Sequence, residues 1–351
     1  FQSKVYCLNI MKNGRLFPAL FLFLPSLLVG TSCHAAESWN ILETVGQPNK
    51  RHEAAFVSYA GKFYLLAGRR IQPVDIFDPA TRTWTHGSPP PIEIHHVQPV
   101  VHDGLIWFIC AMTGPFPNEV GIPFVYTYDP KTDAWARRNP VPEDRIRGSA
   151  GVVFHQGLFY VLSGIINGHI DGWVAWTDTY NPQTGEWKKL PDAPRPRDHF
   201  QAAVAGGKIY ALAGRNTSRV DGKPAHREIS PVDVFDPATE IWSTLPSPAL
   251  DLPTTRAGNS VFVYHDLLLV AGGETLGRQP AHNEVEVLDT EKMRWMSWPP
   301  LARGRHGSGI VMYQNFVYTC AGSGNYGGGP ELHSTERFDI VSHYEGCCRE
   351  P

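Results

Sequence analysis

The sequence predicts an all-β fold built from repeated units of several short strands. The 351 residues include 33 glycines and 30 prolines, as expected for short strands joined by turns. After about residue 37 no stretch shows convincing helical periodicity. A ten-residue pattern also recurs along the chain at a nearly constant spacing, and such a repeat indicates an architecture of stacked, similar units.

The repeated decamer begins as a strand, passes through a turn and ends on tryptophan. Its first copy is DIFDPATRTW, from Asp75 to Trp84, in which Asp78-Pro79 is typical turn chemistry. Later copies end at Trp135, Trp187, Trp242 and, more loosely, Trp295, so the tryptophans are 51, 52, 55 and 53 residues apart. A sixth copy starts as ERFD at Glu336 and reaches no tryptophan.

The missing sixth tryptophan predicts how the repeats close into a ring. The segment SWNILETV carries Trp39 but has no strand and turn in front of it. We therefore expect this N-terminal segment to supply the outer strand of the sixth unit. A ring closed in this way leaves no loose end, which protects its sheet edges from aggregation.

Each copy also carries a two-strand hairpin before the decamer, such as GVVFHQGLFYVLSG from Gly151 and SVFVYHDLLLVAGG from Ser260. Together with a period of about 50 residues, this pattern resembles the kelch repeat, a four-stranded propeller blade. The family's double glycine after the second strand is complete only at Gly272-Gly273. The resemblance covers about Ser38 to Asp339 and implies a six-bladed kelch β-propeller closed by an N-terminal strand in the last blade.

The sequence divides into a presequence (1–36), a propeller (37–341) and a C-terminal tail (342–351). We expect the protein to start at Met11. The segment that follows has a basic beginning, an apolar run and a small-residue end, which is typical of a secretory signal peptide cleaved after Ala35 or Ala36. The alternatives are an uncleaved anchor, for which the run is short, and lipidation at Cys33. We expect a secreted or periplasmic protein with no membrane span in the mature chain.

Registering the repeats on their hairpin turns places arginine at one position in five of six blades and an acid at another in five of six. The blade without the arginine, which has Ile94 and Tyr126, is also the one without the acid. We predict a ring of structural ion pairs, because a guanidinium can bind a carboxylate through two hydrogen bonds. The alternative is a positive collar for an anionic ligand at the channel mouth. The residues concerned are Arg51, Arg147, Arg197, Arg256 and Arg305 with Asp75, Asp178, Asp233, Glu286 and Glu336.

The loops that join the second and third strands of each blade vary most in length, and they share one face with the loops that enter the blades. Variable loops on a rigid scaffold commonly carry function. Aromatic side chains beside polar groups suit a sugar ring, although the loops also suit a protein partner or a simple cover of the blades. The candidate ligand-binding residues are Arg147, Arg197, His199, Arg215, Arg227, Arg256, Glu274, Arg305, His306, Trp173 and Trp176.

No metal and no cofactor are predicted. Of the 15 histidines, His52, His95 and His306 share one repeat position and His96 and His199 the next, but none has a local ligand spacing. Cys110 and Cys320 are expected to be buried in inner strands, so a copper-radical oxidase is not supported. The net charge of −3 argues against a nucleic-acid partner.

These patterns predict a binding scaffold for a glycan or a protein, acting through the long-loop face. The resemblance extends to secreted six-bladed kelch proteins of the sialic-acid mutarotase type, which implies an alternative: a sugar epimerase. Such an enzyme needs an acid/base residue beside an arginine. Glu274, Arg215, Arg227 and His199 are the candidates for those roles, and no motif selects among them.

Overall fold

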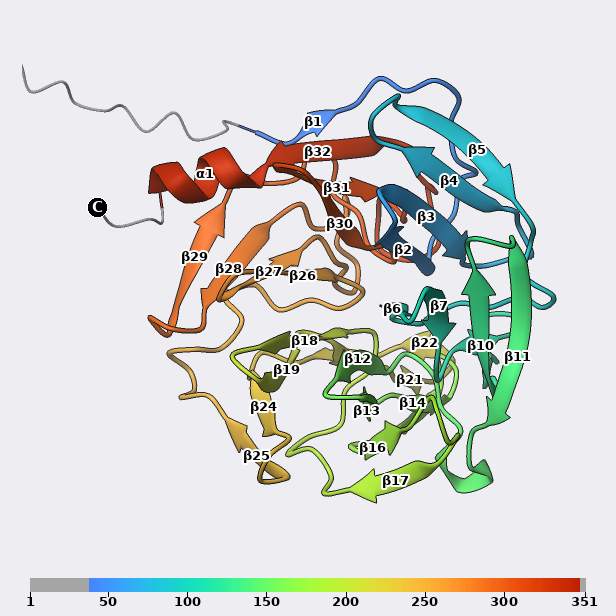
Figure 1. Ribbon diagram of the computed structural model, residues 1–351. Helices are drawn as coiled ribbons and strands as arrows, with labels where there is room; N and C mark the ends of the chain where they lie inside the picture. The colour runs from blue at the N-terminus through green and yellow to red at the C-terminus, as the bar shows by residue number, and fades with distance from the viewer. Residues whose placement is uncertain (1–37, 348–351) are drawn as a thin grey trace, which may run out of the picture. The chain divides into compact units, whose positions relative to one another are not determined.

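The computed structural model describes residues 38–347, which form a ring of six antiparallel four-stranded blades (Figure 1). The inner strands of the six blades contact one another in sequence around the ring, and the last inner strand contacts the first. The predicted all-β propeller is therefore confirmed. The expected signal peptide, Cys33 and Cys348 lie outside the described residues.

The strands of blade one are β2 (Ala54–Tyr59), β3 (Lys62–Ala67), β4 (Val74–Asp78) and β5 (Thr83–Gly87), and those of blade two are β6 (Val100–His102), β7 (Leu105–Phe108), β10 (Phe124–Asp129) and β11 (Ala134–Pro140). Blade three contains β12 (Gly151–His155), β13 (Leu158–Leu162), β16 (Thr177–Tyr180) and β17 (Trp187–Leu190), and blade four β18 (Gln201–Ala205), β19 (Lys208–Leu212), β24 (Asp233–Asp236) and β25 (Ile241–Thr244). Blade five contains β26 (Ser260–Tyr264), β27 (Leu267–Ala271), β28 (Val285–Asp289) and β29 (Arg294–Trp298), and blade six β30 (Ile310–Tyr313), β31 (Phe316–Cys320), β32 (Thr335–Asp339) and β1 (Asn40–Ile41).

The loops between second and third strands carry small hairpins of their own. These pair β8 (Met112–Thr113) with β9 (Val120–Gly121), β14 (Ile165–Asn167) with β15 (Asp171–Trp173), β20 (Arg215–Asn216) with β23 (Arg227–Glu228), and β21 (Arg219–Val220) with β22 (Lys223–Pro224). A single turn of 3₁₀ helix, η1 (Glu143–Arg145), precedes blade three. All four hairpins lie on the face predicted to carry the site.

The N-terminal segment closes the ring as predicted. Strand β1 pairs with β32, and Trp39 stacks on Phe338 with the ring centroids 5.6 Å apart. The segment then runs along blade one, where the Val45 amide donates to the Arg82 carbonyl at 2.8 Å and the Trp84 amide donates to the Val45 carbonyl at 2.9 Å. The same few residues therefore join the first blade to the last.

The helix α1 (Ile340–Cys347) departs from the expectation of a chain without helices. It follows β32 directly, and Asp339 caps it by accepting from the Ser342 amide at 3.0 Å and the Ser342 hydroxyl at 2.9 Å. The ring of His343 packs against Trp298 at 4.7 Å. Eight residues give too few turns for a periodic signal, so tertiary packing decides this helix. No helix among the described residues is long and apolar enough to cross a membrane.

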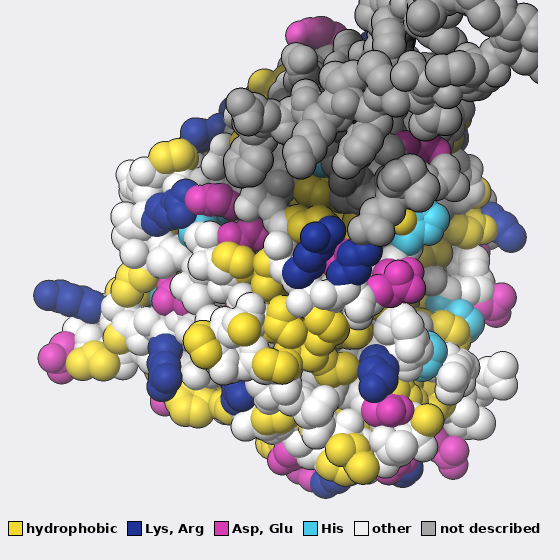
Figure 2. Space-filling model, turned by 90° about the vertical axis from the view of Figure 1, so that its left-hand side faces the viewer, with side chains coloured by type: hydrophobic (Ala, Val, Ile, Leu, Met, Phe, Trp, Pro, Cys, Tyr) yellow, Lys and Arg dark blue, Asp and Glu magenta, His cyan; other side chains and the backbone are white. Residues whose placement is uncertain are grey.

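The repeated tryptophans join neighbouring blades. Each indole N–H of blades two to five donates to a carbonyl of the segment that leaves the preceding blade: Trp135 to Ser88 at 3.0 Å, Trp187 to Pro140 at 3.1 Å, Trp242 to Pro191 at 3.0 Å and Trp295 to Leu250 at 3.1 Å. This contact uses both the apolar body and the polar tip of the side chain. The outer side of the blades mixes acidic and basic side chains around an apolar area (Figure 2).

The five arginines at the shared repeat position pair with the strand acids of their own blades. The N–O separations are 2.6 Å for Arg51–Asp75, 2.9 Å for Arg147–Asp178, and 2.5 Å for both Arg197–Asp233 and Arg256–Glu286, and Arg305 contacts Glu336 in the same way. Each arginine is at most 2% exposed and also donates to backbone carbonyls. In blade two, Ile94 and Tyr126 belong to one buried apolar cluster, so hydrophobic packing replaces the pair there.

The closure of the ring by the N-terminal segment is tested by removing its apolar anchor, Trp39. Trp39→Ala leaves a cavity against Phe338, and we expect a loss of about 3–5 kcal/mol in the free energy of unfolding. The matched control is Ile41→Ala in the adjoining strand β1, because Ile41 is 59% exposed. Deleting residues 38–45 should give aggregating protein. Thermal or denaturant unfolding and size-exclusion chromatography measure both effects, and a truncated chain as stable as the parent would contradict the closure.

The buried ion pairs predict that removing an interior charge lowers the free energy of unfolding far more than removing a surface charge. Arg197→Met leaves the Asp233 carboxylate without its fully buried partner, and we expect a loss of about 3–5 kcal/mol of unfolding free energy. The control, Lys188→Met, breaks a pair of equal length whose side chains are 64% and 45% exposed, and it should cost only about 0–1 kcal/mol. If denaturant titrations show the same loss of unfolding free energy in both variants, the buried pair contributes no more to stability than the exposed pair.

Candidate functional site

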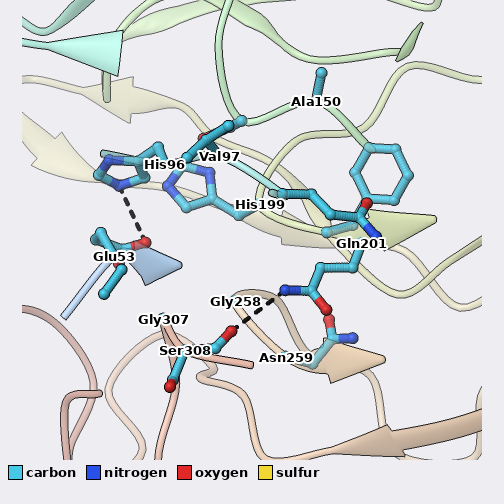
Figure 3. A pocket seen from close by; sticks show the side chains of 14 residues that line it. Glu53, His96, Val97, Ala150, His199, Gln201, Gly258, Asn259, Gly307 and Ser308 are labelled. Atoms are coloured by element: carbon cyan, nitrogen blue, oxygen red, sulfur yellow. Dashed lines mark hydrogen bonds and ion pairs between the residues drawn. The ribbon is translucent and has the colours of Figure 1, made fainter. Parts of the chain in front are cut away.

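A cavity of about 400 Å³ opens on the long-loop face, at the mouth of the central channel. Each of the six blades contributes to its wall a residue that follows the second strand: Arg69, Phe116, His169, Arg215, Glu274 and Tyr326. We call this space the entrance cavity. A smaller cavity of about 40 Å³ lies within the channel and is lined by Glu53, His96, Ser149 and His199 (Figure 3).

The backbone around the channel adopts an unusual conformation at one position in every blade. Two residues after the repeat position held by arginine, φ lies between 51° and 67° in Glu53, His96, Ser149, His199, Gly258 and Gly307. Only two of these six are glycine, so four side chains tolerate the left-handed region. Backbone hydrogen bonds hold the ring, for example from the Gly258 amide to the His199 carbonyl at 2.7 Å and from Ser149 to His96 at 3.0 Å. The ring presents Glu53, His96 and His199 to the channel (Figure 3).

Arg215 and Glu274 form a buried ion pair in the wall of the entrance cavity. The Arg215 Nη1 donates to Glu274 Oε1 at 2.5 Å, and the Gly327 amide donates to Glu274 Oε2 at 2.8 Å. Burial alone raises the pKa of Glu274, but the nearby His306 and Arg215, with the Gly327 amide, outweigh burial and lower this pKa to about 2. Glu274 is therefore a carboxylate at neutral pH, and it can accept a proton or a hydrogen bond but not supply a proton.

Three buried histidines from three blades meet between the two cavities. One ring nitrogen each of His96, His169 and His199 lies within 4.8 Å of the other two. Burial is the main cause that lowers the pKa of both His96 and His199 well below the usual value, so both rings are neutral at pH 7. Neutral imidazoles can accept hydrogen bonds and can ligate metal ions.

The structure sorts the predicted ligand-binding residues into two groups. Arg215, Glu274 and His306 line the entrance cavity, and His199 lines the channel. Arg227 is exposed on β23 and Trp173 on β15 is 41% exposed, and neither lines the two cavities.

The other predicted residues do not reach the cavity. Arg147, Arg197, Arg256 and Arg305 are held by the strand acids, so the arginine ring is no collar for a ligand. Trp176 lies beneath the Arg145 guanidinium at 4.3 Å, which occupies the face of the indole. These arginines share a repeat position because they share a structural role, the pairing with the strand acid of the same blade.

Several cavity residues were not predicted. Arg69 and Phe116 come from loops that differ between blades, so no register within the repeats locates them. Glu53 is the exception, because it occupies the repeat position of His96 and His199 and the alignment of the blades contained it. The prediction of no metal site considered local ligand spacings, and the histidine cluster has none.

The long-loop face carries a set of exposed apolar side chains, which we call the apolar rim. Of the large hydrophobic side chains that are exposed in the described chain, most lie in the loops joining second and third strands: Ile71, Phe116, Val120, Ile166, Trp173, Val220 and Leu276. Phe116 is 55% exposed and also lines the cavity. Exposed apolar side chains gathered on one face are typical of a binding surface.

Comparisons with known proteins agree with this architecture. The chain is 29% identical to the Kelch-like protein terF of Aspergillus terreus over 296 residues, which are 79% of this chain and 61% of that protein. It is 26% identical to Kelch-like protein 35 of Mus musculus, over 60% of this chain and 33% of the relative. It is also 26% identical to Beta-scruin of Limulus polyphemus, over 73% of this chain and 28% of that protein. The chain thus spans less than two thirds of the length of these curated relatives.

Among solved structures, that of YjhT is similar in fold, with a TM-score of 0.67 and 15% identity over 83% of this chain and 96% of that chain. The family model for the KLHDC2/KLHL20/DRC7 Kelch-repeats domain matches residues 125–322, which is more than half of this sequence. With six blades of the predicted strand order, the chain belongs to the kelch-repeat family.

Proposed function

We propose that this propeller is a binding module that receives a carbohydrate group in its entrance cavity. The observation that carries the proposal is a cavity of about 400 Å³ whose wall contains arginine, glutamate and histidine side chains, with exposed apolar side chains on the same face. Pockets of about 300–1,000 Å³ are usual for small ligands. A carbohydrate has an apolar ring face and a border of hydroxyls, and the two parts of the site match these two needs.

The polar groups of the cavity offer donors and acceptors from several directions. Arg69 is held by Glu119 at 2.5 Å, and Tyr326 shares a hydrogen bond of 3.1 Å with His226. Such mutual contacts restrict the side chains before a ligand arrives, which reduces the entropy lost on binding. Phe116 and Trp173 provide aromatic surface at the edge. A glycan carried on a protein partner would reach both the cavity and the rim.

The proposed setting is extracellular or periplasmic, because the N-terminal segment of the sequence has the pattern of a secretory signal. Kelch propellers serve as binding scaffolds, and the relatives found by sequence are named as kelch-like proteins. A protein that docks on the apolar rim without a sugar is the other ligand class that this face suits.

A second candidate function is a sugar mutarotase or epimerase, and the Arg215–Glu274 pair favours it. An arginine beside a carboxylate could hold an acidic sugar next to a proton acceptor. The pKa of about 2 makes Glu274 a weak base, however, whereas an efficient acid/base catalyst has a pKa near the working pH. Bound substrate would have to raise this pKa by displacing the arginine.

The binding proposal predicts the effect of removing the aromatic edge. Phe116→Ala should weaken carbohydrate binding at least tenfold, because a stacking surface at the cavity is lost. Ile241→Ala is the matched control, since Ile241 is 63% exposed on the outer strand β25, and it should leave binding unchanged. A glycan array followed by titration calorimetry makes the measurement. No binding to any sugar, or equal binding by both variants, would rule out a carbohydrate site here.

The enzymatic alternative predicts catalysed exchange of sugar anomers. N-acetylneuraminate in the presence of the protein should equilibrate faster than alone by NMR, and Glu274→Gln should abolish the acceleration. If anomer exchange proceeds at the uncatalysed rate with the wild-type chain, the epimerase alternative is removed while the binding proposal stands.

A further inference from the structure

We propose that His96, His169 and His199 form a binding site for a divalent transition-metal ion of the Zn²⁺ type, between the entrance cavity and the channel. The three ring nitrogens within 4.8 Å of one another carry the proposal, together with the acceptor groups behind the rings. The inference goes beyond carbohydrate binding and does not rest on it.

Carboxylates lie beside the Nδ1 atoms of His199 and His169, on the side of each ring that faces away from the cluster. Asp198 Oδ1 lies 2.5 Å from His199 Nδ1, and Glu119 Oε1 lies 3.0 Å from His169 Nδ1. A carboxylate only accepts, so these contacts favour the tautomer with the hydrogen on each Nδ1, and each Nε2 of a neutral ring then has a lone pair. These two Nε2 atoms are 3.1 Å apart. Two lone pairs at this distance repel each other unless a cation lies between them.

The same reasoning applies to His96 through a chain of two rings. His95 Nε2 lies 3.2 Å from the Gly114 carbonyl oxygen, which only accepts, so His95 donates there and its Nδ1 is an acceptor. His96 Nδ1 is 2.7 Å from that atom and must donate to it. The Nε2 atom of His96 then carries a lone pair, and this atom is buried without a hydrogen-bond partner among the described atoms. All three rings are thus set to present Nε2 as an acceptor.

This arrangement has the features of a three-histidine metal site. Metal-bound histidines usually donate their second nitrogen to a carboxylate or another acceptor, as His199 and His96 do here. The Nδ1 of His169 lies 3.0 Å from the Glu119 carboxylate but makes no aligned hydrogen bond to it. A Zn–N distance of about 2.0–2.1 Å implies nitrogens roughly 3.3 Å apart in a tetrahedral site, close to the spacing of the His169–His199 pair. The longest nitrogen–nitrogen separation in the cluster, up to 4.8 Å, must shorten by roughly 1.5 Å to complete this geometry.

The surrounding charges also suit a cation. Four carboxylates, those of Glu53, Glu119, Asp198 and Glu274, lie around the cluster, against the two guanidinium groups of Arg69 and Arg215. Glu53 Oε2 is 3.5 Å from His96 Nε2, so this carboxylate is placed to act as a fourth ligand or to hold a metal-bound water (Figure 3). His169 lines the entrance cavity, which gives the site access to solvent.

The test uses the full chain without a histidine tag, stripped by a chelator and titrated with Zn²⁺ by calorimetry and with Co²⁺ by visible absorption. We expect one ion per chain. His169→Ala, in a loop, should lower the affinity at least 100-fold and remove the Co²⁺ absorption. Asp198→Asn keeps all three ligands and should lower the affinity about 10–100-fold. The control His333→Ala, a histidine outside the cluster, should bind like the wild type.

Circular dichroism and thermal unfolding establish that each variant is folded. If the wild-type chain binds neither ion in a one-to-one ratio, the proposal is wrong, and the 3.1 Å contact is bridged by an extra proton instead. Equal binding by wild type and folded His169→Ala would likewise overturn it. Should His169→Ala not fold, Asp198→Asn decides the outcome, because an unchanged affinity in that variant contradicts the proposed hydrogen-bonded ligand set.

Discussion

The buried arginine–carboxylate pair is the interaction on which the rest of the propeller depends. In five blades a guanidinium with at most 2% exposure joins the segment that leads into the innermost strand to an acid on the third strand. Removing charges from water is costly unless each is paired and hydrogen-bonded, and the additional bonds to backbone carbonyls meet that condition. The pair therefore fixes where the chain enters each blade.

That fixed point also positions the candidate site. Two residues beyond each arginine the backbone takes the left-handed conformation, and the residues there face the channel. Arg197 is followed by Asp198 and His199, so the structural pair, the carboxylate behind the ring and the ring itself are consecutive. In blade two, Ile94 takes the arginine's place through apolar packing, and His95 and His96 follow in the same geometry. Scaffold and site thus share one short segment.

The two faces of the propeller have different roles. The tryptophan contacts join blades two to five to the preceding blade, and they repeat because these four blades pack on their neighbours in the same way. The loops of the opposite face differ in length and sequence, since nothing in the packing of the blades constrains them. Six unlike loops around one channel place acidic, basic, aromatic and imidazole groups within a single cavity. The ring architecture makes such a combination possible from residues far apart in the chain.

The repeat spacing, the missing sixth tryptophan and the coupled loss of arginine and acid in blade two were sufficient to predict six blades, their closure at Trp39 and the paired positions. These features are periodic, so one chain contains six comparisons of the same position. The meeting of His96, His169 and His199, the Arg215–Glu274 contact and the helix after β32 were decided by the tertiary structure alone. Each joins residues that no period relates, and only the closing of the ring sets the distance between them.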